Sequence, residues 1–160
     1  MLTVAELKER VCSQIDADRD EIVQIAKTVG DNPEPGYREI KTSQLIANKL
    51  RELGVDHRTG LAMTGVKSIP IQGGASGPSI AVLGEMDSLK VAGHVNADPI
   101  TNAAHACGHH AQIGMMLGVG MALLRSEVLS HLSGSVVLFA VPAEEGIENE
   151  FRINLIDQGK

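Results

Sequence analysis

The sequence predicts an α/β fold, in which a mixed sheet is flanked by helices on both of its faces. The strongest indication is the order of the expected elements, which runs helix, helix, strand, strand, helix, strand, helix. The chain has 160 residues, which is enough for one domain with a real core. Only 2% of the residues are aromatic, so this core has to be built from Val, Ile, Leu, Ala and Met.

Two helices are predicted at the start of the chain. The TVAE motif at residues 3–6 fits a capping box, and apolar residues then recur at near-helical spacing over residues 4–29. The segment GDNPEPG at residues 30–36 breaks this helix, because it contains two prolines and two glycines. A second amphipathic helix is expected over residues 38–53, with Gly54 as its C-terminal stop.

Three apolar segments predict strands. Residues 66–74 (VKSIPIQGG) and 78–87 (PSIAVLGEMD) are joined by the turn-rich GGASGP, which predicts a hairpin or at least two adjacent strands. Residues 134–142 (GSVVLFAVP) predict a further buried strand.

A buried helix is predicted between these strands, after a loop over residues 92–104 and ending near Ser126. It contains three glycines, Gly114, Gly118 and Gly120. Glycine costs about 1 kcal/mol in a helix interior, and close approach of this helix to the sheet is the expected compensation. A last helix is expected to begin within residues 150–160.

Composition and charge argue against several classes of protein. The formal net charge is −6 and the chain has no basic stripe, which argues against a nucleic-acid partner. The start, MLTVAELKER, carries charges of both signs and does not resemble a signal peptide. The longest apolar run, residues 111–124, is too short to span a membrane. Cys12 and Cys107 are too few for a disulfide framework, so a cytoplasmic location is expected.

The segment HACGHH at residues 105–110 concentrates soft ligands at the start of the buried helix. Cys107 and His109 are two residues apart, and an extended backbone places such a pair on one face. Gly108 between them favours a tight, non-helical backbone, so the helix should begin at about His109 or His110. A thiolate and an imidazole at this position are good ligands for a transition metal.

Two acidic motifs follow predicted strands, where α/β sheets usually place their sites. In VPAEEG, Glu144 and Glu145 are adjacent, so one can bind a metal while the other faces a bound water. In LGEMDSL, Glu85 and Asp87 leave the strand on one face and can orient the metal ligands.

Plainer interpretations exist for several of these residues. An adjacent pair of glutamates is usually solvated, and His105 and His110 could be surface or hydrogen-bonded histidines. Cys12 is expected to be a packing residue. The isolated histidines are expected to lie at the surface; they are His57, His94 and His131.

Four motifs in one order resemble the M20 metallopeptidase family. They are NPEPGYRE, GEMDSL, HACGHH and PAEEG, all within residues 32–146. Together they are most similar to the amidohydrolase branch, which includes N-acyl-amino-acid and aminobenzoyl-glutamate hydrolases. The resemblance implies a zinc-exopeptidase-like catalytic domain that uses two divalent metal ions, zinc or manganese, to hydrolyse an amide bond in a small molecule or peptide.

The family pattern also implies a role for individual residues. Cys107 would bridge or bind the metals, and His109 and Glu145 would bind metal. Glu144 would be the general base for a metal-activated water. Asp87 would lie near the site and help to orient it.

The chain departs from the family pattern in places. His110 stands where the family usually has Asp or Asn, and GEMD replaces the commoner RADMD. Family members are more than twice as long, with two further histidine ligands and a lid domain that often mediates dimerisation. The resemblance therefore implies that residues 1–160 are the N-terminal part of the catalytic domain without the lid. We expect this chain to be inactive alone, and a homo-oligomer to be the assembled form.

Two other classes of function remain open from the sequence. The chain could be a non-catalytic metal-binding or interaction domain, which would bind metal without turnover. It could also be a cysteine hydrolase using Cys107 and a histidine, but Cys107 and His109 are so close in sequence that an attacking geometry looks strained, and the glutamate pair would have no role.

Overall fold

The computed structural model describes residues 2–145 and 149–159. The helices in this part of the chain are α1 (Val4–Ala17), α2 (Arg19–Gly30), α3 (Ile40–Glu52), α4 (His109–Arg125) and α5 (Asn149–Asp157), with a 3-10 turn, η1, over Val128–His131. The strands are β1 (His57–Leu61), β2 (Gly65–Ser68), β3 (Ile71–Gln72), β4 (Ala75–Glu85), β5 (Leu89–Lys90), β6 (Ala103–Ala104) and β7 (Ser133–Val141).

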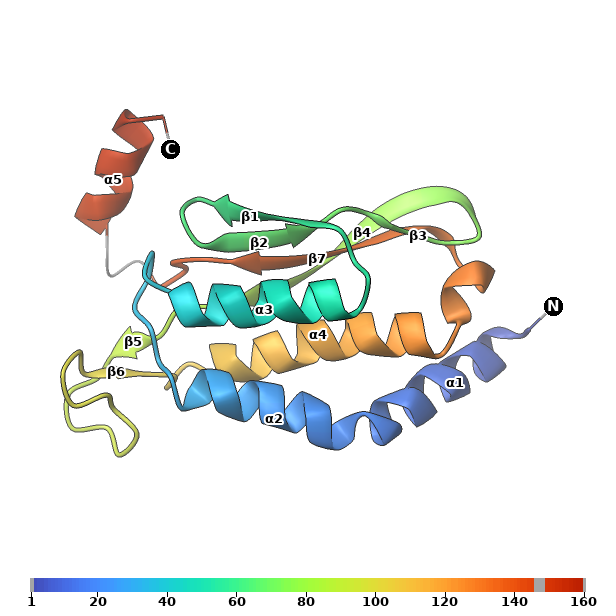
Figure 1. Cartoon of the computed structure of the whole chain (residues 1–160), viewed down its shortest axis with the longest axis horizontal. Coiled ribbons are helices and arrows are strands. Elements are labelled where there is room, and N and C mark those ends of the chain that lie inside the picture. Colours follow the sequence, from blue (N-terminus) through green and yellow to red (C-terminus); the bar gives the residue numbers. More distant parts are fainter. Residues whose placement is uncertain (1, 146–148, 160) are drawn as a thin grey trace.

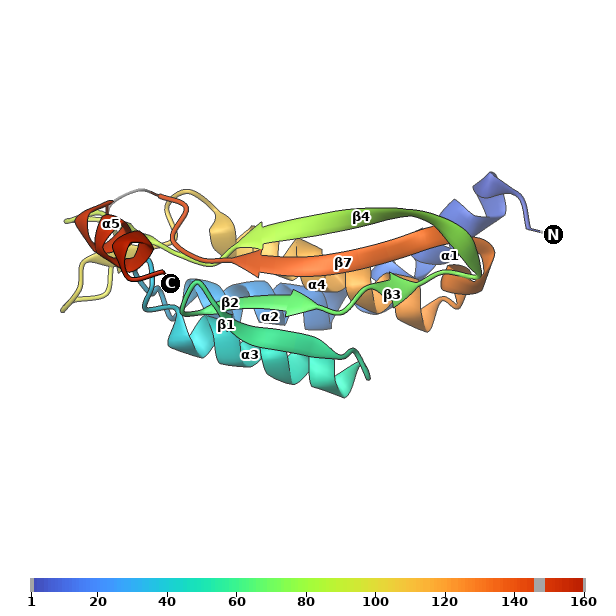
Figure 2. The same ribbon diagram turned by 90° about the horizontal axis from the view of Figure 1, so that it is seen from above.

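The main sheet is mixed, as the sequence predicts, and β7 is its central strand. Strands β2 and β3 pair antiparallel with β7, and β4 pairs with it in parallel. Because Val136 is opposite both Ile71 and Ile80, β3 and β4 lie on opposite edges of β7. The order is visible from above in Figure 2.

The predicted hairpin over residues 66–87 is therefore wrong, because β7 lies between the two strands that it would have joined. The glycine-rich connection crosses the start of β7 instead. The N–H of Gly73 donates to the carbonyl of Gly134 at 2.8 Å, and that of Gly74 donates to the carbonyl of Leu129 at 3.0 Å. These glycines allow a close approach of two backbones and do not form a hairpin turn.

The helices of residues 2–145 cover one face of the sheet, which corrects the expectation of helices on both faces. Figure 1 shows α3 and α4 against the sheet, with α1 and α2 in a further layer beneath α4. The physical reason is that α4 is apolar around most of its circumference, and so it packs against the sheet on one side and against α2 on the other.

The first predicted helix is divided in two. The capping box is confirmed, since the N–H of Glu6 donates to the Thr3 hydroxyl and the N–H of Thr3 donates to the Glu6 carboxylate. The helix then bends at Asp18, between α1 and α2, so that both halves contact α4 (Figure 1). Cys12 is exposed, so its expected packing role is wrong.

The glycines of α4 allow close packing on two sides. A Cβ at Gly120 would collide with Leu138 of β7, which confirms the expected approach to the sheet. A Cβ at Gly114 would lie 3.0 Å from the Cβ of Ala26 in α2, and Gly118 faces α2 in the same way. The core around α4 is aliphatic and methionine-rich, as predicted; its fully buried members include Ile46, Leu50, Ile113, Met116, Leu117, Met121 and Leu138.

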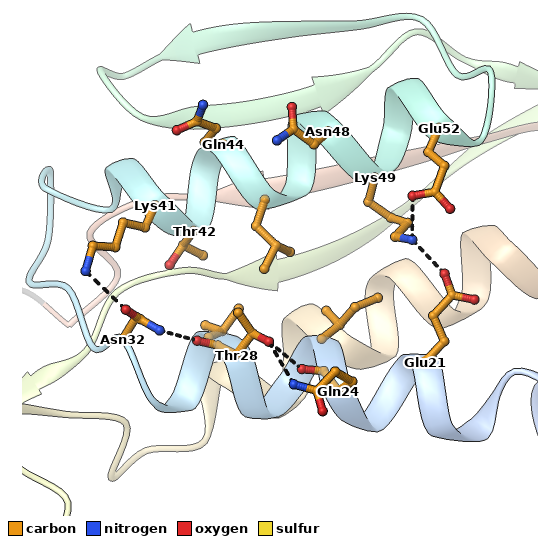
Figure 3. A pocket seen from close by; sticks show the side chains of 13 residues that line it. Glu21, Gln24, Thr28, Asn32, Lys41, Thr42, Gln44, Asn48, Lys49 and Glu52 are labelled. Atoms are coloured by element: carbon orange, nitrogen blue, oxygen red, sulfur yellow. Dashed lines mark hydrogen bonds and ion pairs between the residues drawn. The ribbon is translucent and has the colours of Figure 1, made fainter.

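A hollow of about 670 Å³ lies between α2 and α3, and Figure 3 shows its polar lining. The lining side chains bond one another. Lys41 donates to Asn32 at 3.1 Å, and the ammonium of Lys49 lies 2.6 Å from Glu21 and 2.8 Å from Glu52. The paired polar side chains that line the hollow therefore help to hold α2 and α3 together.

Replacing Glu21 by glutamine should lower the free energy of unfolding by about 1 kcal/mol at pH 7. Hydrogen bonds from Arg125 and then Lys49 lower the pKa of Glu21 to about 2. Because Glu21 is 34% exposed, solvent screens these pairs and keeps the effect small. The folded-state pKa lies below the ordinary value of 4.5, so the contribution is complete above about pH 4.5 and is lost as the pH falls towards 2.

Urea denaturation of both proteins from neutral to acidic pH would measure this contribution. Glu52→Gln is the matched control, because the Glu52 carboxylate is more exposed and, among the described residues, pairs with Lys49 alone. A stability difference for Glu21→Gln that stays constant as the pH falls would contradict the assignment.

The outer edge of β4 is exposed along most of its length. In the described residues β4 pairs with β7 alone, and Ile80 and Leu83 are 62% and 56% exposed. An uncovered strand edge tends to pair with another chain. We therefore predict that the isolated chain self-associates through β4.

Analytical ultracentrifugation over a range of concentrations would test this self-association. Ile80→Lys and Leu83→Lys should shift the chain towards monomer, because charges on an edge strand oppose pairing. Val95→Lys, in the loop between β5 and β6, is the control, since Val95 is 91% exposed but lies outside β4. A monodisperse monomer at every concentration would overturn the prediction.

Candidate metal centre

Three segments that are distant in sequence meet at one edge of the sheet. Because β4 and β7 are parallel neighbours, Glu85 and Val141 end opposite each other. Asp87 follows the end of β4, Glu144 and Glu145 follow the end of β7, and α4 begins at His109 between them. The structure thus brings together the acidic motifs and the histidine motif that the sequence singled out.

His109 is the centre of this group and is 1% exposed. Its Nδ1 lies 2.8 Å from the backbone carbonyl oxygen of Asp87 and 3.3 Å from that residue's carboxylate. Since a carbonyl oxygen can only accept a hydrogen bond, Nδ1 carries the ring proton and donates a hydrogen bond to the carbonyl oxygen of Asp87. The lone pair of Nε2 is therefore directed into the site, as in a metal-binding histidine.

Three carboxylates surround that nitrogen. Nε2 of His109 lies 2.9 Å from Glu85, 3.6 Å from Glu145 and 3.8 Å from Glu144. Among the described residues, this nitrogen and an oxygen of Glu145 are buried without a hydrogen bond of acceptable geometry. Buried polar atoms are nearly always paired, and a lone pair facing carboxylates is the arrangement that a divalent cation completes. The donor set thus fits a metal.

Cys107 belongs to the same group. The ligand atoms of Cys107, His109 and Glu145 all lie within 4.8 Å of one another, and a second such group comprises Glu85, His109 and Glu144. The expected non-helical backbone at Gly108 is confirmed by its φ of 102°. The Glu145 carboxylate, which hydrogen-bonds the thiol and repels a thiolate, raises the pKa of Cys107.

Asp87 links the two strand ends. It is 2% exposed, and its carboxylate accepts a hydrogen bond from the backbone N–H of Glu145 at 3.0 Å. The same residue holds His109 through its carbonyl group. Asp87 therefore fixes the position of an imidazole and of a glutamate backbone at once.

The segment NPEPGYRE supports the loop that carries the glutamates, a role that the sequence did not reveal. Glu39 is fully buried; its carboxylate accepts hydrogen bonds from the N–H of Ala143 at 2.9 Å and the hydroxyl of Thr64 at 2.6 Å. Burial raises the pKa of Glu39. A Cβ at Gly36 would lie 3.0 Å from the Cβ of Ala143, so glycine is needed for this packing.

Ala143 itself has a positive φ of 53°, which is an uncommon backbone conformation for alanine. The hydrogen bond to Glu39 thus holds a strained bend directly before Glu144. The sequence signal for this role of Glu39 was weak, because a glutamate just before a helix is usually a solvated residue at the helix start.

Gln112 is a second supporting residue that sequence reasoning missed. Its side-chain nitrogen donates to the Glu85 carboxylate at 2.9 Å, and its oxygen accepts from the N–H of Glu85 at 3.2 Å. This double contact joins the first turns of α4 to the end of β4. Glu85, expected only to orient the ligands, lies closer to Nε2 of His109 than Glu144 or Glu145 does.

For His105 and His110 the alternative was a surface or hydrogen-bonded role; both ring nitrogens of His105 and Nδ1 of His110 are buried, and no described residue hydrogen-bonds these atoms. Both residues are partly buried, and their ring centroids are 5.4 Å apart. Burial, together with the nearby charges of His110 and His109, lowers the pKa of His105 to about 4. Of the other histidines, His131 is exposed while His57 and His94 are partly buried.

The sequence predicts that no segment is long enough to span a membrane, and the helices in residues 2–145 and 149–159 can be compared with this prediction. None of these helices has both the length and the apolar character that crossing a bilayer requires.

Comparison with known proteins shows which proteins this chain is similar to. No family model matches the chain. It is 38% identical over 131 residues to IAA-amino acid hydrolase ILR1-like 2 of Arabidopsis thaliana, which covers 80% of this chain and 29% of the relative. It is 32% identical over 143 residues to thermostable carboxypeptidase 2 of Saccharolobus solfataricus, which covers 88% of this chain and 36% of the relative.

A solved structure gives the same relationship. The YXEP protein of Bacillus subtilis, a dinuclear metal binding peptidase from the M20 family, superimposes with a TM-score of 0.69 at 26% identity, over 81% of this chain and 36% of the other. The chain spans about a third of the length of the curated relatives it matches. From the sequence matches and the shared fold, the chain belongs to the M20 family of amidohydrolases and peptidases.

Proposed function

We propose that the complete protein is a metal-dependent amidohydrolase that cleaves an amide bond of an N-acyl amino acid, an aminobenzoyl-glutamate or a small peptide. The observation that carries the proposal is the convergence of Cys107, His109 and Glu145 within 4.8 Å, beside a second glutamate. The relatives' names, an amino acid conjugate hydrolase and a carboxypeptidase, support an amide bond next to an amino acid as the target.

In this proposal Cys107, His109 and Glu145 hold a pair of divalent metal ions, zinc or manganese. The thiolate and imidazole favour zinc, while the carboxylates also suit manganese. The likeness to a dinuclear metal binding peptidase supports two ions. Bound metal would supply Lewis acidity for the amide carbonyl and for water.

The two glutamates divide the remaining work. Glu145 is 16% exposed, and its backbone is fixed by Asp87, which suits a ligand held in one position. Glu144 is 49% exposed, so its carboxylate reaches the space where substrate and water enter. Glu144 is therefore the general base: it accepts a proton from the attacking water and then gives it to the leaving amine.

Asp87 is a positioning residue in this scheme. Its carbonyl holds the proton of Nδ1 on His109, which keeps Nε2 available as a ligand. Its carboxylate orders the backbone of Glu145.

The proposal concerns the complete protein. Residues 1–160 would supply the first part of the catalytic domain, and further metal ligands and a lid domain would come from elsewhere in the enzyme. We propose that the active form is a homo-oligomer and that the 160 residues alone have no measurable amidohydrolase activity.

The alternative classes make different demands on the site. A cysteine hydrolase needs a thiolate stabilised by its surroundings, whereas the Cys107 thiol faces carboxylates and its pKa is raised. A non-catalytic metal-binding domain would use the same donors without turnover. A rate assay on the metal-loaded complete protein separates this alternative from the enzyme.

The 160-residue chain should bind divalent metal only weakly at this centre, because Cys107, His109 and Glu145 would have to serve a pair of ions, whereas one catalytic zinc ion normally has three protein ligands plus water. Calorimetry would measure the affinity, and the thiolate charge-transfer band of bound Co²⁺ would report on Cys107. Replacing Cys107 and His109 by alanine should remove the band. Cys12→Ala is the control, because Cys12 lies in α1. A band that persists without Cys107, or its absence from the unmodified chain, would contradict the assignment.

A further inference from the structure

Helix α5, which follows the glutamate pair in sequence, is bonded back to the residue that precedes the pair. Arg152 of α5 donates from Nη2 to the backbone carbonyl of Ala143, and from Nε to the hydroxyl of Tyr37 at 3.1 Å. The ring of Phe151 also meets the ring of Tyr37 in an edge contact, with centroids 5.4 Å apart. Figure 1 and Figure 2 both show α5 beyond the end of β7. The helix therefore contacts the bend between β7 and the glutamates.

Both polar backbone groups of Ala143, the residue directly before Glu144, are bonded to side chains. The N–H of Ala143 donates to Glu39 at 2.9 Å, and its carbonyl accepts from Arg152. Its φ of 53° is uncommon for alanine, and such a conformation persists only where the surroundings hold it. Loss of either bond would let the bend relax, and the direction of the next side chain would change with it.

Glu144 is therefore held through its two neighbours. On its other side, the N–H of Glu145 donates to the carboxylate of Asp87 at 3.0 Å. The Glu144 carboxylate itself is 49% exposed and lies 3.8 Å from Nε2 of His109. A displacement of about 1 Å in a reacting group can cost on the order of 10²-fold in rate, so the bonds that fix the backbone on either side of Glu144 bear directly on catalysis.

The shape of arginine suits the double contact that Arg152 makes. Nε and Nη2 lie along one edge of a planar guanidinium, so one side chain can hold two acceptors at a fixed separation. The Tyr37 hydroxyl accepts one hydrogen bond and orients the plane, and the Ala143 carbonyl accepts the other. Lysine carries a single ammonium on a flexible stem and cannot reproduce this arrangement.

We propose that Arg152 is a positioning residue for the general base. From α5 it holds the carbonyl of Ala143 and so sets the direction of the Glu144 carboxylate, while Tyr37 orients the guanidinium. The inference rests on the proposed function, in which Glu144 is the base. In this scheme Arg152 touches neither substrate nor metal, and it acts on the reaction only through the backbone before Glu144.

Steady-state kinetics on the complete enzyme tests this role. Arg152→Lys should lower kcat by about 10–100-fold and leave KM and metal content unchanged, because a displaced base weakens only the transition state. Tyr37→Phe should lower kcat less, since Arg152 keeps its bond to Ala143, and it keeps the test valid if Arg152→Lys misfolds. Arg58→Lys, an exposed change in β1, is the matched control. A raised KM with unchanged kcat, loss of metal, or unchanged kinetics in the folded variants would overturn the proposal.

A double-mutant cycle separates positioning of the base from simple support of the fold. In Glu144→Gln, where the base is already absent, Arg152→Lys should cause no further loss of kcat. A further loss as large as that in the unmodified enzyme would show that Arg152 acts independently of Glu144, and the positioning role would be wrong. Full activity in Glu144→Gln itself would instead show that Glu144 is not the base, which removes the proposed function and this inference with it.

Amide hydrogen exchange on the 160-residue chain tests the contact without any activity. Arg152→Lys should speed exchange at Ala143 and Glu145, whose N–H groups are bonded only while the bend is held in place. Exchange at Leu138, whose N–H donates to Ser68 within the sheet, should stay the same. Unchanged exchange at Ala143 would show that α5 does not hold the bend, and would overturn the proposal whatever the activity of the complete enzyme.

Discussion

Replacing Glu144 by glutamine in the complete enzyme should lower kcat by about 10²–10⁴-fold while metal content and fold stay unchanged. An amide cannot accept the proton of the attacking water, but it occupies the same space as the carboxylate. Glu144 is 49% exposed and stands 3.8 Å from His109, so its loss leaves the closer ligands untouched. Steady-state kinetics together with metal analysis would measure both effects.

Glu145→Gln should give the opposite pattern, with loss of metal as the primary defect. Glu145 is close to both Cys107 and His109, and an amide is a poorer ligand than a carboxylate. Glu150→Gln, an exposed change in α5, is the matched control for both variants. If Glu144→Gln lost metal and Glu145→Gln kept it, the roles of base and ligand would be exchanged.

Replacing Glu39 by alanine should lower the free energy of unfolding by about 2–4 kcal/mol, the second-largest effect that we expect. The change leaves the N–H of Ala143 and the hydroxyl of Thr64 without their acceptor in a buried position. Chemical denaturation would measure the loss, with Glu9→Ala on the exposed side of α1 as the control. A loss below about 0.5 kcal/mol, the range of neutral surface changes, would contradict the buried role.

The pH dependence of Glu39 provides a separate check. Burial raises its folded-state pKa above the ordinary value of 4.5, so the folded protein holds the proton more tightly than the unfolded chain. Stability from this group is therefore complete below about pH 4.5 and is lost as the pH rises through the folded-state pKa. The advantage of the unmodified protein over Glu39→Gln should shrink over that range.

The residues that we propose as metal donors could be singled out from the sequence because each lies next to a strong local signal. Cys107 and His109 share a short segment with a helix start, and the glutamate pair follows an apolar strand. Their supports could not be predicted. The contact of Gln112 with Glu85, and that of Glu39 with Ala143, join segments far apart in the chain, and neither pair has a local signature.

The elements of the fold were largely predictable, but their pairing was not. Periodicity identified α3, α4 and β7, because each carries a regular apolar pattern. It missed β1, whose sequence HRTGL is too polar to indicate a strand. The hairpin prediction for β3 and β4 was wrong because β7, far along the chain, pairs with both. Such a non-local choice is not visible in a short window.

The central position of β7 has a consequence for how the protein is made. Strands β2, β3 and β4 all emerge from the ribosome before the strand that each of them pairs with. At about 5–20 residues per second, the nascent chain spends seconds with these strands unpaired. Translation through β7 is then the step that closes the sheet. Chaperone binding should be strongest just before that step, and a pause in translation upstream of Ser133 should increase aggregation during synthesis.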